Sequence, residues 1–266
     1  MKNKLPLLLA LALSGATVGA IALRARSANG LSDRLLAQPS QPVNNTLRQT
    51  RFRFIPPKRI GKPITVGGAT RGGCPDKGRP LTSLIPQKDN VGLTVSDRPT
   101  FWVYVPYEPK EVLFGEFSLQ DEKDNEVYRT RFELSGAPGV VSVRVPSTKA
   151  ALETGKVYNW YFKISCPSQE AAEEPDTAFV RGWVERVERP DVESQLKATT
   201  TPVERIAIYA KEGIWYEALT ELAQARLTNS QDTELTNAWA DILQSAGLEK
   251  LDKDPVVGSV KTSSQP

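Results

Sequence analysis

Histidine is absent from this chain of 266 residues. It is the usual general base near neutral pH and the commonest metal ligand in proteins. Its absence excludes a Ser-His-Asp triad, a Cys-His dyad and a histidine-based zinc site. We therefore expect that the protein is not an enzyme and has no catalytic residue, no bound metal and no cofactor. The catalytic alternative is a hydrolase that uses two carboxylates facing each other in one cleft.

Cysteine is almost as scarce and occurs only at Cys74 and Cys166. Two thiolates cannot complete the four-coordinate shell of a structural zinc ion. The pair does not form the Cys-x-x-Cys motif of redox proteins, and no histidine is present to activate either thiol. We expect one structural disulfide between Cys74 and Cys166, because the chain has the features of an exported protein.

Those features lie at the N-terminus. Lys2 and Lys4 precede an apolar stretch from Leu5 to Leu23, which is the order of a secretory signal. Residues 1–26 are therefore interpreted as a signal peptide or as an uncleaved membrane anchor, since this stretch is close to the lower limit for spanning a bilayer. Both readings predict a periplasmic or extracellular protein whose contact with a membrane is made only through this segment.

Residues 27–62 show no helical or strand period and contain several prolines, which predicts a flexible linker. Charge is unevenly distributed: residues 43–90 hold ten Lys or Arg and two Asp or Glu, whereas residues 202–251 hold four and eight. Either these parts attract each other, or the basic part lies on an anionic membrane or polymer. An exported chain without a nucleic-acid-binding motif is not expected to bind nucleic acid.

Residues 63–190 alternate between short β-prone runs and turn residues. In the clearest run, 157–166, aromatic and aliphatic side chains fall on one face with a period of two. The run 101–105 is apolar on both faces, which suggests that helices cover the second one. This pattern predicts a mainly β fold, an immunoglobulin-like antiparallel β-sandwich. Its predicted strands are 101–105, 112–120, 126–134, 140–145, 157–166 and 179–187.

Residues 201–250 change to a helical period. Thr201 and Asp232 are helix N-caps in the pattern, and Gly213 and Gly247 are typical helix ends. We expect a small α-helical hairpin module, too short to be a free domain, that packs on the sandwich or on a partner. The polar residues 251–266 predict a disordered tail.

Two places could form a binding surface. The glycine-rich stretch 67–74 contains Thr70 and Arg71 but lacks the lysine and hydroxyl of a phosphate-binding P-loop. It is either a flexible loop leading to the disulfide or a source of backbone amides for an anion or sugar. Trp102, Tyr104 and Trp183 are aromatic residues in β-prone runs, which either pack in the core or form an exposed platform.

The chain also resembles a known family. The resemblance is carried by residues 67–74, 92–106, 138–141, 155–162 and 179–183, and it extends over roughly residues 55–250. These segments resemble the cyanobacterial family catalogued as domain of unknown function 928. The resemblance implies an exported cyanobacterial protein. That family has no assigned catalytic or binding residues, so no site is carried over from it.

Together these features predict a non-catalytic, exported protein-interaction module of the periplasm or cell envelope, with a protein partner there. The alternative is a carbohydrate- or cell-wall-binding module, whose partner is a glycan or wall polymer. The aromatic residues and the basic segment support this alternative.

Overall fold

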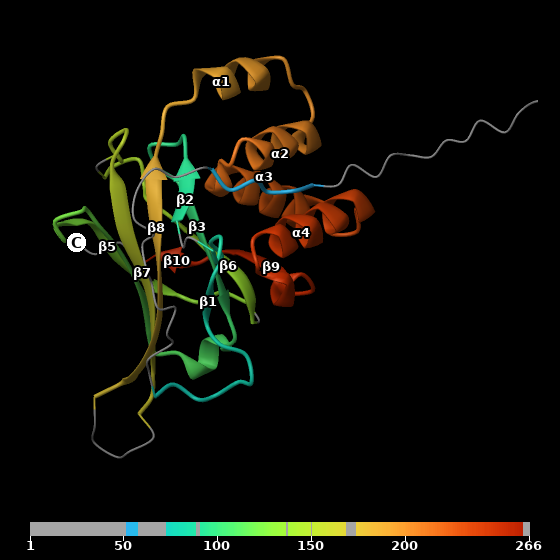
Figure 1. Ribbon diagram of the computed structural model, residues 1–266. Coiled ribbons are helices and arrows are strands. Elements are labelled where there is room, and N and C mark those ends of the chain that lie inside the picture. Colours follow the sequence, from blue (N-terminus) through green and yellow to red (C-terminus); the bar gives the residue numbers. More distant parts are fainter. Residues whose placement is uncertain are drawn as a thin grey trace, which may run out of the picture. The chain divides into compact units, whose positions relative to one another are not determined.

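Strands fill the first part of the described chain, α-helices follow, and two short strands close it (Figure 1). The computed structural model describes residues 52–57, 73–88, 91–136, 138–149, 151–168 and 174–262. The predicted signal or anchor at 1–26, most of the linker at 27–62, and both Thr70 and Arg71 lie outside these residues. The described part contains no helix that is long and apolar enough to cross a membrane.

The strands form two sheets, with the orders β1-β3-β6-β9 and β10-β5-β4-β7-β8-β2. The interior pairs are antiparallel, as predicted, but β2 pairs parallel to β8 and β9 parallel to β6. The antiparallel prediction is therefore wrong for these two strands, which reach the sheets through long connections instead of hairpins. The strands are β1 (Thr82–Ser83), β2 (Val91–Thr94), β3 (Thr100–Val105), β4 (Phe114–Gln120), β5 (Glu126–Glu133), β6 (Gly139–Arg144), β7 (Val157–Cys166), β8 (Asp176–Arg186), β9 (Val256–Ser259) and β10 (Lys261–Thr262).

Aromatic side chains fill the space between the two sheets. The Phe101 ring of β3 lies 4.9 Å from that of Phe117 on β4 and 5.5 Å from that of Trp160 on β7, measured between ring centroids. A Cβ atom at Gly182 of β8 would lie 2.6 Å from the Trp160 ring, so only glycine leaves room for it. The period-two alternation of 157–166 thus points its large side chains into this core, as predicted.

The second apolar face of β3 is covered by a helix. The Trp102 side chain is 2 % exposed and donates a hydrogen bond from Nε1 to Oγ1 of Thr220 on α3, at 3.0 Å. Tyr104 is 5 % exposed, and the guanidinium of Arg79 lies over its ring. The expectation that a helix covers the second face of this strand is confirmed. The interpretation of Trp102 and Tyr104 as a binding surface is wrong, because both rings are buried.

The predicted caps are present on α2 and α4, whereas α1 was not predicted from the sequence. The Thr201 hydroxyl accepts a hydrogen bond from the Glu204 N–H, and the Asp232 carboxylate accepts bonds from two N–H groups of the first turn of α4. Gly213 follows α2 with φ 73°, the left-handed conformation that favours glycine. The helices are α1 (Pro190–Lys197), α2 (Pro202–Lys211), α3 (Trp215–Thr228) and α4 (Thr233–Ser245), with short 3₁₀ turns at Pro109–Glu111 and Glu249–Leu251.

Segments predicted to be loose belong to the fold. Phe52 and Phe54 are buried, and the Phe54 ring meets the Trp215 ring edge-on at 4.8 Å, so residues 52–57 are not a flexible linker. Residues 256–262 are not a disordered tail, since β9 pairs with β6 and β10 with β5. The helices pack on the strands in the same compact unit.

A disulfide joins Cys74 to Cys166, the last residue of β7, with the two Cα atoms 5.5 Å apart. The expected pairing is confirmed. It ties the segment before β1 to the end of the longest central ladder, and it is compatible with an exported protein.

Candidate functional site

The six-stranded sheet has a second face, turned away from the four-stranded sheet. Figure 1 shows α2, α3 and α4 together on the other side of the strands from β5 and β7. Along β8 the buried residues alternate with partly exposed ones, and the partly exposed residues of β7 all fall on one side of that strand, so side chains of one parity point away from the core. We call this surface the outer face; its central residues are Glu116, Ser118 and Gln120 of β4, Arg129 and Arg131 of β5, Asn159, Tyr161 and Lys163 of β7, and Phe179, Arg181 and Trp183 of β8.

Strand register arranges these side chains in rows. Directly opposed residues on neighbouring strands lie close enough for their side chains to interact. Each row contains one aromatic ring, carried by β8, β7 and β8 in turn. The rows are Phe179–Lys163–Glu116, Arg181–Tyr161–Ser118 and Trp183–Asn159–Gln120.

The third row contains two polar groups that lack partners. Asn159 is 4 % exposed and donates from Nδ2 to the Tyr161 hydroxyl at 2.7 Å, but its Oδ1 accepts no hydrogen bond. Nε1 of Trp183, on the opposed residue, is also buried and donates none. Unsatisfied buried polar atoms destabilise the fold. A hydroxyl group donates one hydrogen bond and accepts another. It is therefore suited to satisfy both the Asn159 acceptor and the Trp183 donor.

The cations of the outer face fall into two groups. Arg129 forms ion pairs with Glu116 and Glu126, and Arg131 lies over the Phe114 ring at 4.5 Å. By contrast, the side chains of Lys163 and Arg181 form no ion pair or hydrogen bond with any residue that the structure describes. These two cations are therefore available to an anionic group.

A shallow hollow of about 340 Å³ lies on the same face. Glu116, Ser118, Arg129, Tyr161, Lys163 and Phe179 contribute to its lining. Since its floor is the β4–β7–β8 ladder, whose backbone is fixed by sheet hydrogen bonds, the positions of these side chains are set before any ligand arrives.

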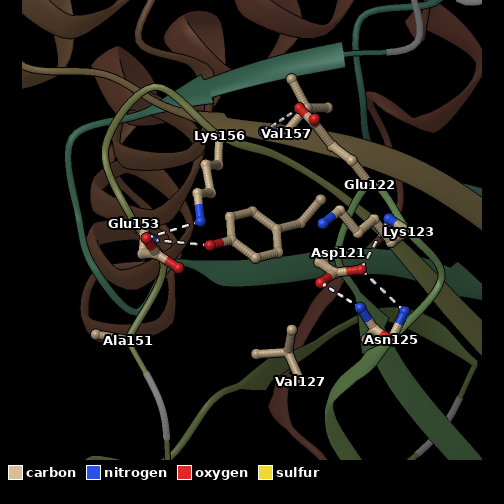
Figure 2. Close-up of a pocket in the computed structure, with 10 residues that line it drawn as sticks. Asp121, Glu122, Lys123, Asn125, Val127, Ala151, Glu153, Lys156 and Val157 are labelled. Atoms are coloured by element: carbon tan, nitrogen blue, oxygen red, sulfur yellow. Dashed lines mark hydrogen bonds and ion pairs between the residues drawn. The ribbon is translucent and has the colours of Figure 1, made fainter.

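A second hollow, of about 420 Å³, is lined by the loop between β4 and β5 and by residues around the start of β7 (Figure 2). Its polar groups bind one another. Lys156 pairs with Glu153 at 2.8 Å, and the Tyr158 hydroxyl accepts from the Glu153 N–H. The Asp121 carboxylate accepts three hydrogen bonds, from the side chain and the N–H of Asn125 and from the N–H of Lys123. The bond from the Asn125 side chain is the main cause of the lowered pKa of Asp121. This is a solvated hairpin turn with its polar groups already satisfied.

No cluster suited to a metal ion occurs in the described ranges: no three Asp, Glu, Cys or His side chains gather in them to bind one.

A third hollow, of about 170 Å³, contains a buried carboxylate. Oε1 of Glu217 accepts from the Thr94 hydroxyl at 2.5 Å and from the Ser96 N–H at 3.1 Å, while Oε2 is buried without a partner. Burial raises the pKa of Glu217. Glu221, one turn along α3, also lines the hollow but is ion-paired with Arg205 at 2.7 Å. Glu217 therefore links α3 to the β2–β3 connection, and Glu221 is already neutralised.

The structure separates the residues predicted as a binding surface. Trp183 lies on the outer face, Trp102 and Tyr104 lie in the core, and the structure does not describe Thr70 and Arg71. Sequence reasoning missed Lys163, Phe179 and Arg181. The signal that could have found them lies in the alternate residues of 157–166 and 179–187 that do not face the core. Aromatic and cationic residues occur together at those positions.

Comparison with known proteins gives one match. A model of the family described as Domain of Unknown Function (DUF928) matches residues 66–256, which includes all the strands of the outer face. No curated protein and no solved structure matches the chain.

Proposed function

The chain belongs to the family described as Domain of Unknown Function (DUF928), and we propose that it is an exported, non-catalytic interaction module of the periplasm or cell envelope. Export is supported by the two lysines and the apolar stretch at the N-terminus. The Cys74–Cys166 disulfide is compatible with the oxidising compartment that export implies.

One observation supports the binding role above all. The outer face presents three half-buried aromatic rings, of Tyr161, Phe179 and Trp183, beside Lys163 and Arg181, two cations that form no ion pair with any described residue. Aromatic and Arg side chains on a rigid scaffold are the usual anchors of binding surfaces. All three rings remain partly exposed in the folded chain. We infer that this face holds the partner.

The helices give less support to a protein partner than their sequence suggested. Trp215, Leu219 and Trp239 are each 0 % exposed, so the apolar sides of α3 and α4 are used inside the unit. The proposed partner-binding surface is therefore the outer face and not the helices. That face favours a second candidate function, a carbohydrate- or wall-binding module, because a sheet face with partly exposed rings suits the stacking of sugars.

The immunoglobulin-like assignment is also a proposal. It is supported by the antiparallel β5–β4–β7–β8 ladder, whose side chains meet those of β3 across the core. The parallel strands β2 and β9 depart from the usual arrangement. An experimental structure in which these ladders do not face each other would reject the assignment. Fold likeness carries no function, so the binding proposal depends on the outer face alone.

Co-sedimentation with envelope fractions tests the proposal. The purified full chain is mixed with isolated cell-wall sacculi and with membranes, and the pelleted fraction is measured. We expect wild type to pellet with an envelope fraction and the double variant Tyr161→Ala/Trp183→Ala to stay in solution. Leu227→Ala is the matched control, since Leu227 is an exposed apolar residue of α3, away from the outer face. Wild type that pellets with neither fraction would refute the binding role.

Export has its own test. Cells are fractionated, and the mass and free-thiol content of the native protein are measured. A thiol-free protein in the periplasmic or envelope fraction is expected, either shortened by signal cleavage or retained at full length by an anchor. A cytosolic, full-length protein with two free thiols would overturn the export proposal.

A further inference from the structure

The outer face has the geometry of a site for a charged polymer. We propose that it binds an acidic polysaccharide, one chain of which lies along β7 and β8 across the rings of Phe179, Tyr161 and Trp183. This inference rests on the proposed binding function and names its ligand class.

The spacing of the three rings suits an extended ligand. Phe179 and Trp183 are four residues apart on the same face of β8, which places them about 13 Å apart. Tyr161 lies between them on the neighbouring strand, opposite Arg181. The three rings therefore form a bent row that is longer than one sugar ring. Sugars present C–H groups that stack on aromatic rings and hydroxyls that bind polar neighbours, so a row of rings selects a chain of sugars.

The cations indicate that the polymer is acidic. Lys163 is directly opposed to Phe179, and Arg181 to Tyr161, so two of the three rings have an unpaired cation beside them. A carboxylate or sulfate carried by a stacked sugar would meet one of these cations and form a charge-assisted hydrogen bond. A neutral glycan would stack equally well but would leave both cations unused. Glu116, which is opposed to Lys163, is ion-paired with Arg129.

The polar pair at the end of the row fits the hydroxyls of the same ligand. Asn159 Oδ1 and Trp183 Nε1 are an acceptor and a donor without partners, on directly opposed residues. A sugar hydroxyl donates and accepts at once, so a small shift of the Trp183 side chain would let one hydroxyl satisfy both atoms. An acidic peptide would pair with the cations, but its backbone N–H donor and C=O acceptor are separate atoms, so no single backbone atom can satisfy both.

The chain's own basic segment is a poor occupant of this face. Residues 43–62 contain several Lys and Arg and no Asp or Glu. Lys163 and Arg181 would repel such a segment. The occupant that we propose is instead a separate, negatively charged molecule.

Matched polymers test the ligand class. Binding of the full chain to polygalacturonate, chondroitin sulfate, methyl-esterified polygalacturonate and polyglutamate is followed by affinity electrophoresis and by tryptophan fluorescence. We expect at least one of the two acidic polysaccharides to bind, with an affinity that falls as salt is raised. The uncharged ester and the acidic peptide should bind at least about tenfold more weakly.

Matched variants test the placement. Lys163→Gln/Arg181→Gln and, separately, Trp183→Ala should each weaken binding of the acidic polysaccharide by about tenfold or more. Lys197→Gln/Lys211→Gln is the control, because it removes the same charge from exposed positions on α1 and α2. Thermal melting of every variant establishes that it is folded before its affinity is compared.

The outcomes separate this inference from the function on which it rests. Envelope binding without affinity for either acidic polysaccharide, or equal binding of polyglutamate, overturns the ligand class and leaves the interaction role intact. Polysaccharide binding that survives both outer-face variants overturns the placement. Absence of any envelope binding removes the proposed function itself.

Discussion

Replacing Tyr216 with phenylalanine should lower the free energy of unfolding by about 2–4 kcal/mol. Tyr216 is 1 % exposed at the start of α3, and its hydroxyl joins the helix to the six-stranded sheet. It accepts a hydrogen bond from Trp160 Nε1 at 2.8 Å and donates one to the Trp183 carbonyl at 3.1 Å. Burial holds the pKa of Tyr216 well above its usual range, so the hydroxyl keeps the proton that it donates.

The magnitude follows from the two groups that lose their partner. A buried donor or acceptor left unsatisfied costs about 1–3 kcal/mol. Trp160 is 0 % exposed, so no water can replace the lost oxygen at its N–H, and its cost should lie in the upper half of that range. The Trp183 carbonyl belongs to β8, which is paired with strands on both sides. The loss of its hydrogen bond from Tyr216 should therefore cost less free energy than the loss at Trp160. The phenyl ring keeps its contact with Phe101, so no large cavity opens.

Urea unfolding followed by far-UV circular dichroism measures this change, with an unchanged slope m as the sign that the unfolded state is the same. Tyr128→Phe is the matched control, because the Tyr128 hydroxyl makes no hydrogen bond to any described residue. Its effect should stay below about 0.5 kcal/mol. If both variants lose equally little stability, the Tyr216 hydroxyl does not hold the helix to the sheet and the reasoning is wrong.

Three further predictions concern the fold. Cys74→Ala/Cys166→Ala should lower the free energy of unfolding by about 4–5 kcal/mol, since the disulfide closes a loop with a sequence separation of 92; a loss under about 1 kcal/mol in urea titrations would contradict this. Phe54→Ala should cost about 3–5 kcal/mol through the cavity left beside Trp215, and a neutral result would remove residues 52–57 from the core. Burial raises the pKa of Glu217, so its protonation contributes stability that is complete below the unfolded pKa of about 4.3 and is lost as the pH rises through the raised value. Glu217→Gln mimics the protonated form and should flatten the fall of the unfolding free energy as the pH rises above the unfolded pKa; a curve parallel to wild type would reject the explanation.

Patterns with a local cause could be predicted from the sequence. The alternation of residues 157–166 follows from one face of a strand being buried, and β7 occupies that range. The caps at Thr201 and Asp232 depend only on a side chain reaching N–H groups of the next turn, and both are present. Each of these features involves residues that are close along the chain.

Features that depend on distant residues could not be predicted in the same way. All four residues of β2 are buried, so this strand shows no alternation to recognise. β9 consists of four residues in a polar context and becomes a strand because β6 lies beside it. Residues 52–57 resemble a linker, but the N–H of Phe54 donates to the Ser245 hydroxyl on α4, 191 positions away. No short window of sequence contains that information.

Trp102 and Trp183 show why the site itself was only half predictable, and they also show why the outer face is the candidate. Both are tryptophans in β-prone runs, and neither is distinguished by its own residue type. β3 is apolar on both faces, and α3 covers the second one, so packing fully explains Trp102. β7 instead alternates between large apolar residues and Asn159, Tyr161 and Lys163, the pattern of a strand with one solvated face. A strand that faces water needs no aromatic rings there, and the rings of Tyr161, Phe179 and Trp183 stay partly exposed on the outer face. The rings that folding does not explain are the ones to test for binding.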